Sequence, residues 1–275
     1  MAIEKDRATV HVPSPHQAMR VHRLTDKERI LQFLETDRSY AAYAIGDLEP
    51  SLFRQTRWVG TELAGQLCTV ALLFKGIDPP ALFLMGDPAG LSAILHLRIR
   101  DRRVYVTCKP EHLPPVGAFY QAEEPIPMWR MTVQANEFRP VQSGDVAPLS
   151  PRHTEELERL YAQGGGMAFS PTQLATGVYF GVVEYGQVVA AAGTHLISPT
   201  YGLAAVGNVY TQDSRRGRGY GTATTSAVLA QLFERGIRHV FLNVAQANTI
   251  AIGIYERLGF TKSCAFLEML AVRKQ

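Results

Sequence analysis

The second half of the chain carries two alternating hydrophobic patterns. Residues 203–210 and 240–244 are nearly continuous apolar runs, which is typical of strands in the interior of a sheet. Residues 222–235 and 248–258 instead repeat apolar side chains every three or four positions, as a helix does when one face is buried. Around them the pattern predicts a strand at 146–149, a helix at 151–162, a hairpin at 179–195 and a closing strand at 264–272.

The first half alternates strands and helices in a similar way. A helix is expected after Thr25, which fits the N-cap position with Glu28 as the second member of a capping box. A hairpin within residues 58–74 follows. The remaining pattern predicts a helix from Pro88 and strands at 81–85, 104–108 and 128–133. This alternation favours a mixed α/β layer.

Two breaks in the pattern divide the chain. Residues 1–18 show no periodicity, which predicts a flexible arm. A second break at residues 134–140 predicts a boundary between a domain at 19–135 and a domain at 140–275. The fold class expected for both domains is α/β, with a mixed sheet.

Composition narrows the function classes. Of the 275 residues, 46% are hydrophobic, but no apolar run approaches the roughly 18 residues of a membrane span, and the N-terminus lacks the apolar centre of a secretory signal. A cytoplasmic protein without a membrane partner is expected. The net charge of +3 suits a small anionic ligand and is too weak to indicate nucleic acid. Cys68, Cys108 and Cys264 are widely spaced and form no metal-binding pair, so no metal is expected.

The strongest chemical signal lies between a predicted strand and a predicted helix, in the run Arg215-Arg216-Gly217-Arg218-Gly219-Tyr220-Gly221. Glycines at alternate positions let the backbone turn sharply and aim successive N–H groups into one concavity. The helix that follows adds the positive end of its dipole, and Arg216 and Arg218 add charge. The run predicts a pyrophosphate site; a purely structural glycine turn is the alternative.

Three phosphate-binding motifs compete for this run. A Walker A loop would need Gly-Lys-Ser or Gly-Lys-Thr at its end, and the run has neither. A dinucleotide fingerprint would need G-x-G-x-x-G and an acid about 20 residues later, whereas the run reads G-x-G-x-G and residues 236–238 supply no acid. The coenzyme A pattern is Arg or Gln, two residues, Gly, one residue, and Gly or Ala, which is matched by Arg216, Gly219 and Gly221.

Residues further along extend this match. A second pattern, N-x-x-A-x-x-x-Y-x-x-x-G-F, is formed by Asn248, Ala251, Tyr255, Gly259 and Phe260. Together with the strand that leads into the loop, these residues resemble the GNAT superfamily of N-acetyltransferases, in the branch near glycine N-acyltransferase-like proteins. The resemblance covers residues 140–272 and implies the GNAT fold there. Residues 19–135 resemble a degenerate copy of that fold, because R-x-x-G-x-G does not occur in them.

The resemblance implies a binding mode for acetyl-CoA, the expected cosubstrate. The strand before the loop would pair its backbone with the pantetheine arm through Val209 and Thr211, with Tyr210 between them. Asn248 would reach the cofactor from the next helix, and its role as N-cap of that helix is the alternative. The pyrophosphate would be held by the backbone amides of Arg216, Gly217, Arg218, Gly219, Tyr220, Gly221 and Thr222.

The resemblance also implies that Tyr255 is the catalytic residue. Attack by an amine on the thioester expels a thiolate, and a phenol beside the sulfur can protonate it as it leaves. From the residues alone, Ala251, Ile254, Tyr255 and Leu258 form one helical stripe, so a core role for Tyr255 stays open.

The base that deprotonates the amine is left open. Residues 203–211 contain no acid, and the proton could pass through water to His195, Glu184 or a backbone carbonyl. Asn208 and Asn243 are polar residues in apolar strands and need partners, which could be the substrate or the neighbouring strands.

These inferences predict an acyltransferase that moves the acetyl group of acetyl-CoA to a primary amine by direct attack. The acceptor would be a small molecule or a peptide. Two alternatives stay open, a non-catalytic acyl-CoA sensor or scaffold and an acyltransferase for longer acyl groups. Neither the acceptor nor the oligomeric state, monomer or homodimer, follows from the sequence.

Overall fold

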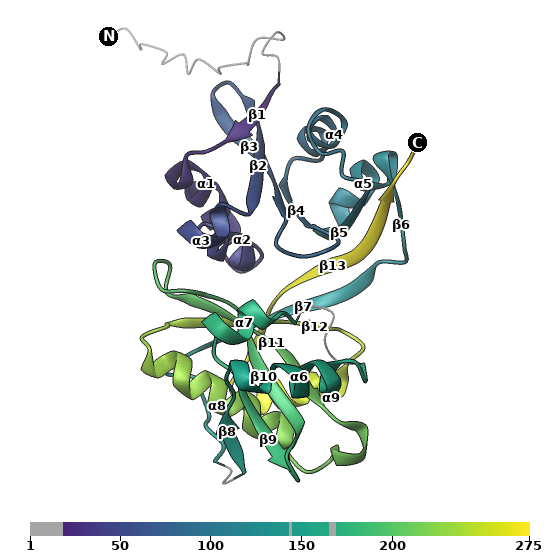
Figure 1. Ribbon diagram of the computed structural model, residues 1–275. Helices are drawn as coiled ribbons and strands as arrows, with labels where there is room; N and C mark the ends of the chain where they lie inside the picture. The colour runs from purple at the N-terminus through teal and green to yellow at the C-terminus, as the bar shows by residue number, and fades with distance from the viewer. Residues whose placement is uncertain (1–18, 143–144, 165–168) are drawn as a thin grey trace, which may run out of the picture.

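A single sheet runs through both halves of the protein. The computed structural model describes residues 19–142, 145–164 and 169–275, and the predicted arm at 1–18 lies outside the described residues. The sheet has 13 strands in the order β1-β2-β3-β4-β5-β13-β7-β12-β11-β10-β9-β8, with β6 paired to β13 beside this path. Figure 1 shows the two halves one above the other. The expected mixed α/β fold is confirmed.

The upper half in Figure 1 is built from the first part of the chain. Its strands are β1 (Arg20–Leu24), β2 (Thr56–Leu63), β3 (Gln66–Phe74), β4 (Ala81–Gly86) and β5 (Arg103–Cys108). Its helices are α1 (Lys27–Leu34), α2 (Ala42–Gly46), α3 (Pro50–Phe53), α4 (Pro88–Leu97) and α5 (Leu113–Phe119). The N-cap of α1 is Asp26 and not the expected Thr25, because the Asp26 carboxylate accepts hydrogen bonds from two free amides of the first turn, at 3.0 and 3.1 Å.

The lower half is built from the second part of the chain. Its strands are β8 (Val146–Pro148), β9 (Phe180–Glu184), β10 (Gln187–Ser198), β11 (Leu203–Thr211) and β12 (His239–Ala245). Its helices are α6 (Thr154–Tyr161), α7 (Pro171–Thr176), α8 (Tyr220–Glu234) and α9 (Thr249–Arg257). Among the described residues, no helix is long and apolar enough to cross a membrane. Within the same residues, no group of three His, Cys, Asp or Glu side chains could hold a metal ion.

The two halves exchange strands at the centre of the sheet. β7 (Ile126–Gln134) comes from the first part of the chain and pairs antiparallel with β12 of the lower half. β13 (Thr261–Arg273), the last strand, pairs antiparallel with β5 of the upper half and with the short β6 (Tyr120–Ala122). Figure 1 shows β13, in yellow, rising from the lower half beside β7. Each half therefore completes its sheet with a strand from the other part of the chain. The predicted boundary at 134–140 stays a prediction.

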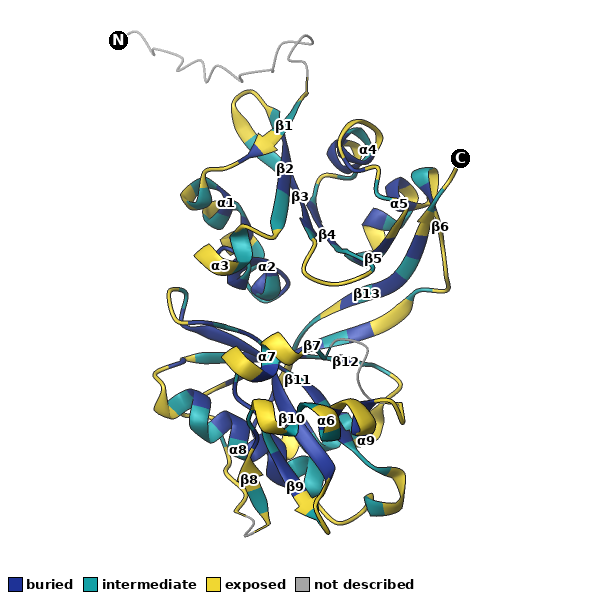
Figure 2. Cartoon of the chain, viewed as in Figure 1, coloured by how far each residue is buried: buried dark blue, intermediate teal, exposed yellow. Residues whose placement is uncertain are grey.

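Helices cover both faces of the sheet, and buried residues concentrate along the strands (Figure 2). α4 and α5 pack on the upper half, and their core includes residues of β13. In the lower half, α8 and α9 share one core with β12, while α6 and α7 share another with β10. α1 and α2 bury a core that spans the halves, with Ile45 and Leu196 in the same cluster.

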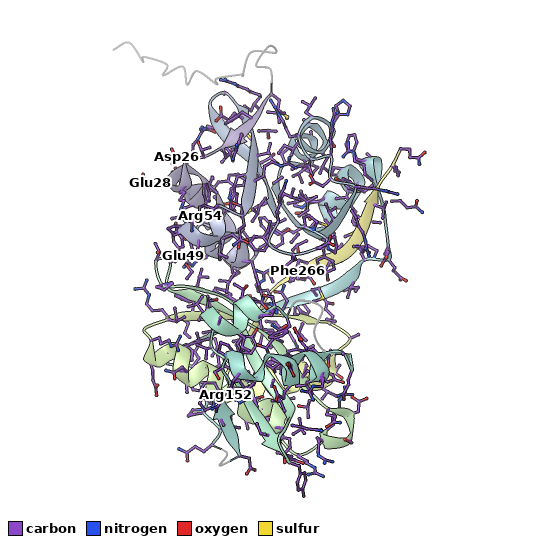
Figure 3. The ribbon with its side chains drawn as sticks, in the orientation of Figure 1. Asp26, Glu28, Glu49, Arg54, Arg152 and Phe266 are labelled. Carbon is purple, nitrogen blue, oxygen red and sulfur yellow. The ribbon has the colours of Figure 1, made fainter. Side chains whose placement is uncertain are left out.

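Polar contacts of Glu49, which lies between α2 and α3, fasten this region to the lower half. Glu49 accepts hydrogen bonds from the Ser198 hydroxyl at 2.7 Å and from the Thr200 N–H at 2.9 Å. Figure 3 labels Glu49 at the edge of the upper half that faces the lower half. Gly46 permits the close approach, because a Cβ there would lie 2.6 Å from Leu196 Cδ1. α2 is thus held directly over β10.

Candidate active site

β11 and β12 run parallel but pair only where they begin. The register joins residues 203–205 of β11 to residues 239–241 of β12. β11 continues to Thr211 without further pairs to β12, so its backbone on that side can pair with another extended chain. This separated end contains the predicted cofactor contacts Val209, Tyr210 and Thr211.

The glycine loop connects β11 to α8. Gly217 and Gly219 have φ angles of 78° and 80°, in the left-handed region that favours glycine, and Gly219 is the N-cap of α8. The Ala223 N–H donates to the Gly219 carbonyl at 3.0 Å. The N–H groups of residues 220–222 precede that bond and have no partner inside the helix. Together with the helix dipole they can bind an anion.

Glu184, the last residue of β9, holds the loop from its outer side. Its carboxylate accepts hydrogen bonds from Arg215 Nε and from the Tyr220 hydroxyl, each at 2.8 Å, and lies 3.7 Å from Arg218 Nη1. The hydrogen bond from Tyr220, followed by the contacts with the two arginines, keeps the pKa of Glu184 below its ordinary value. These contacts favour a loop-positioning role over the proton-accepting role that the sequence left open.

Two further predicted cofactor contacts are engaged with the protein itself. Arg216 forms an ion pair with Asp213 at 2.7 Å, and its guanidinium lies over the Tyr210 ring at 5.8 Å. The Asn248 side chain accepts a hydrogen bond from the Ala251 N–H at 3.1 Å and so caps α9. For Asn248 and Arg216, a contact with the cofactor stays a prediction.

Tyr255 lies on α9, beneath the separated strands. It is 7% exposed and packs edge-on against Phe260, with ring centroids 5.8 Å apart. Burial raises the pKa of its phenol to about 12. Burial raises the pKa of Tyr43 of α2, and the nearby Tyr255 adds a smaller effect in the same direction. The upper half thus reaches the region of Tyr255.

His195 of β10 meets Tyr43 beside the separated strand. The Tyr43 hydroxyl lies 3.3 Å from His195 Nδ1. The His195 ring lies against Gly207 of β11, where a Cβ would overlap the imidazole. Burial lowers the pKa of His195, against a weaker opposing contact with Asn208, so the ring is neutral near pH 7. Within the described residues, the buried Nε2 has no hydrogen-bond partner.

The two asparagines in apolar strands have protein partners. Asn208 has a positive φ of 52°, donates to the Tyr179 hydroxyl at 2.8 Å and accepts at its carbonyl from the Tyr161 hydroxyl at 2.7 Å. Asn243 donates to Glu268 Oε1 at 3.0 Å. Both asparagines therefore tie strands to their surroundings, and Asn208 fixes an irregular backbone in β11.

Two residues near the site were not singled out from the sequence. Arg130 of β7 is 1% exposed and lies between the rings of Tyr43 and Phe266, at 4.8 and 4.9 Å. Asp47 lies one helical turn beyond Tyr43, and burial raises its pKa to about 8. In the sequence, Arg130 could have been identified as a candidate because it is a lone arginine inside an apolar strand.

The upper half has a related strand pair without the anion site. β4 and β5 are parallel and pair over residues 81–83 and 105–107. The Tyr40 hydroxyl donates to the Leu84 carbonyl at 2.7 Å, at the end of this pairing. The carboxylate of Asp87 caps α4 by accepting from the Gly90 N–H at 2.9 Å. An acid thus occupies the helix N-terminus that would otherwise attract a phosphate.

Known sequences match the second half of the chain. Residues 144–260 match the sequence profile of the acetyltransferase (GNAT) family. A mycothiol acetyltransferase from Thermobispora bispora is 47% identical over 60 residues, which is 21% of this chain and 20% of that protein. The match thus spans about a fifth of the length of this curated relative.

Solved structures match over most of the chain. An acetyltransferase of the GNAT family from Novosphingobium aromaticivorans is 22% identical, with a TM-score of 0.60 over 74% of this chain and 89% of that one. A tandem GNAT protein from the clavulanic acid biosynthesis pathway is 14% identical, with a TM-score of 0.60 over 93% of this chain and 98% of that one. These matches show the fold, in two related halves.

Proposed function

From the match of residues 144–260 to the acetyltransferase (GNAT) family, we propose that the protein transfers the acetyl group of acetyl-CoA to a primary amine. One observation carries the proposal: β11 separates from β12 and runs directly into the free N–H groups at the start of α8. An extended pantetheine arm ending in a pyrophosphate fits this arrangement. The acceptor would be a small molecule or a peptide, and a cytoplasmic location stays a prediction.

In the proposed reaction the amine nitrogen attacks the thioester carbon directly. The C–N bond forms and the C–S bond breaks. The nitrogen loses one proton, and coenzyme A leaves as a thiolate that gains one. Two groups that handle protons are therefore needed, one on each side of the reacting carbon.

Tyr255 is proposed to serve the leaving sulfur as general acid. With a pKa of about 12, its phenol stays protonated at physiological pH. Because an ordinary thiol has a pKa of ~8.5, complete transfer of the phenol proton to sulfur is uphill. We therefore expect Tyr255 to act mainly through a hydrogen bond that strengthens as charge develops on the sulfur.

His195 is proposed to accept the proton of the amine. Its lowered pKa keeps the ring neutral, and its buried Nε2 lacks a partner within the described residues. For Nε2 to accept a proton, Nδ1 must carry the hydrogen and donate it to the Tyr43 hydroxyl, which lies 3.3 Å away.

Release of free thiol tests the proposed transfer and the role of Tyr255 together. The protein is incubated with acetyl-CoA and a panel of primary amines while the coenzyme A thiol is measured. Tyr255→Phe is expected to lower turnover by roughly 10²–10⁴-fold while the acetyl-CoA dissociation constant changes little. Tyr185→Phe is the matched control, because Tyr185 is 98% exposed at a hairpin turn.

Each outcome has a separate meaning. An unchanged rate in Tyr255→Phe would overturn the role of Tyr255 but not the transfer itself. Saturable acetyl-CoA binding without thiol release for any amine would favour the sensor alternative, which is supported by the lack of an acid among residues 203–211 of β11. Longer acyl-CoA donors in the same assay measure the acyl range.

A further inference from the structure

Arg130 is a buried charge that contacts no acid among the described residues. Its Nε and Nη1 atoms have no hydrogen-bond partner, and it takes part in none of the ion pairs found among the described residues. Figure 3 labels Phe266, one of the two rings that enclose Arg130, where β13 passes between the halves. Burying a charge without a partner is costly, so a ligand that pairs with Arg130 would be strongly favoured.

Arg273 of β13 is an arginine of the same protein whose guanidinium does have hydrogen-bond partners. Its guanidinium also lies over two rings, those of Phe119 at 5.6 Å and Tyr120 at 5.3 Å. Its Nη1, however, donates to the carbonyls of Leu95 at 3.0 Å and Ile99 at 2.7 Å. The difference between the two arginines is therefore the unpaired N–H groups of Arg130, and not the aromatic packing.

Arg130 lies close to the proposed chemistry. The Tyr43 ring covers its guanidinium, and the Tyr43 hydroxyl contacts His195. On the sheet, Arg130 stands directly opposite Asn243 of β12, one of the two strands that separate. A ligand group on Arg130 would thus be about one tyrosine side chain away from His195, which a short aliphatic molecule can span.

The geometry of Arg130 selects a planar anion. Tyr43 and Phe266 cover the guanidinium plane at 4.8 and 4.9 Å, which leaves its N–H-bearing edges. An anion that lies in that plane and offers two oxygens makes paired hydrogen bonds with such an edge. A carboxylate has this shape.

Two buried acids of this region do not take this place, although Arg130 acts against the rise that burial causes in the pKa of Glu268. Glu268 already accepts hydrogen bonds from the Tyr105 hydroxyl at 2.9 Å and from Asn243 at 3.0 Å. Asp47 acts on Tyr43 from the next turn of α2, and because burial raises its pKa to about 8 it is mostly uncharged at pH 7. Neither acid neutralises Arg130 by direct contact, and Asp47 does not repel an anionic ligand at that pH.

We propose that the acceptor is an amine that also carries a carboxylate, and that Arg130 binds this carboxylate while the amine reaches the separated ends of β11 and β12. The inference rests on the proposed acetyl transfer and specifies its substrate class as small amino acids. It gives the upper half a direct part in the reaction, because Tyr43 supplies one wall of the carboxylate site.

Matched acceptors test the class without any mutation. Alanine, β-alanine and 4-aminobutyrate are each compared with their own primary amide, with thiol release as the readout. The amide has the lower amine pKa, so amine reactivity alone favours the amide. A kcat/KM at least about tenfold higher for the carboxylate in the best pair supports the proposal. An equal or higher value for the amide in all three pairs overturns it.

Variants of Arg130 test the residue. Arg130→Gln is expected to lower kcat/KM for the carboxylate acceptor by about 30-fold or more while the amide changes little. Arg130→Lys keeps the charge without the planar fork and should recover part of the loss. Arg273→Gln is the matched control and should leave the carboxylate-to-amide ratio unchanged. An equal loss on both acceptors in Arg130→Gln, with acetyl-CoA binding intact, overturns the assignment of Arg130.

The experiments distinguish a failure of this inference from a failure of the proposed function. No thiol release with any amine overturns the acetyl transfer and the inference with it. Equal use of both members of every pair overturns the inference alone. If Arg130→Gln fails to bind acetyl-CoA because it does not fold, the unmodified protein and Arg130→Lys still decide the question.

Discussion

Burial acts on Tyr255 and His195 in opposite directions on the pKa scale, and in both cases it favours the uncharged side chain. The pKa of Tyr255 rises to about 12 and that of His195 falls, because each loses hydration of its charged form. A neutral phenol can donate a hydrogen bond, and a neutral imidazole can accept a proton. The site therefore has a donor and an acceptor ready at the same pH.

The pH dependence of the rate should follow His195. Its neutral form is needed, so kcat/KM is full above the pKa of His195 and falls as the pH drops through it. Because that pKa is below 6.5, the acidic limb should lie below pH 6.5. His195→Gln should remove this limb and lower the rate, whereas His96→Gln, on exposed α4 surface, should change neither. An acidic limb that persists unchanged in His195→Gln contradicts the assignment.

Single residues differ in how far the sequence predicts them. Tyr255 and the glycines of the loop belong to local patterns, and the resemblance of these patterns to the GNAT superfamily implied their roles. Arg130 has no such pattern, because its position depends on Tyr43 and Phe266, which come from distant segments of the chain. The protein partners of Asn208 could not be predicted either, because they come from α6 and from the residue just before β9.

At the scale of elements, the turn from β11 into α8 has a backbone that only glycine adopts easily. Gly219→Ala should cost about 1–2 kcal/mol of stability, because φ is 80° there. It should also weaken acetyl-CoA binding by reorienting the first amides of α8, as measured by titration. Gly236→Ala is the matched control, since Gly236 has φ of 83° at the other end of α8 and equally open space.

The paired glycine variants separate strain from function. Gly236→Ala should lose a similar amount of stability in thermal unfolding while keeping its affinity for acetyl-CoA. If both variants bind acetyl-CoA as the unmodified protein does, the loop does not hold the cofactor. If both lose affinity equally, the effect comes from general destabilisation and not from the loop.

The long elements were predictable, whereas most short ones, apart from β8, were not. The strands and helices around the loop follow strong periodic patterns, and the structure contains them within a few residues of the expected bounds. α2 was not predicted, because its sequence Ala-Tyr-Ala-Ile-Gly has too few bulky apolar residues for an amphipathic stripe. Its helix is stabilised by packing on β10, including the close approach at Gly46, which only the tertiary structure supplies.

At the scale of the whole molecule, the exchanged strands β7 and β13 make the halves interdependent. Ile94→Ala in α4 removes a fully buried side chain of the upper half and should cost about 2–5 kcal/mol. Calorimetry should still show one unfolding transition, and amide exchange should quicken in α8 of the lower half as well as in α4. Ile250→Ala is the control, because Ile250 is 80% exposed. Two separate transitions with unchanged protection of α8 would contradict this coupling.

The exchange itself could not be predicted from the sequence. The apolar pattern of β7 identifies a strand, and that of β13 does too, but neither pattern encodes a partner. Pairing of β7 with β12 and of β13 with β5 depends on contacts between residues far apart in the chain. The sequence break at 134–140 therefore follows β7, a strand at the centre of one sheet, and precedes β8, which lies at the edge of that sheet.

The position of β13 also constrains the order of events during synthesis. Residues 261–273 are translated after all the other strands described here, yet they form the strand beside β5. While the ribosome is still making the second half, one side of β5 has no strand to pair with. Such an unpaired edge can pair with strands of other nascent chains. Domains ordinarily fold as they emerge, N-terminal domain first. Here the sheet of the first half is completed only by β13, so the unpaired edge of β5 needs protection until β13 has been made.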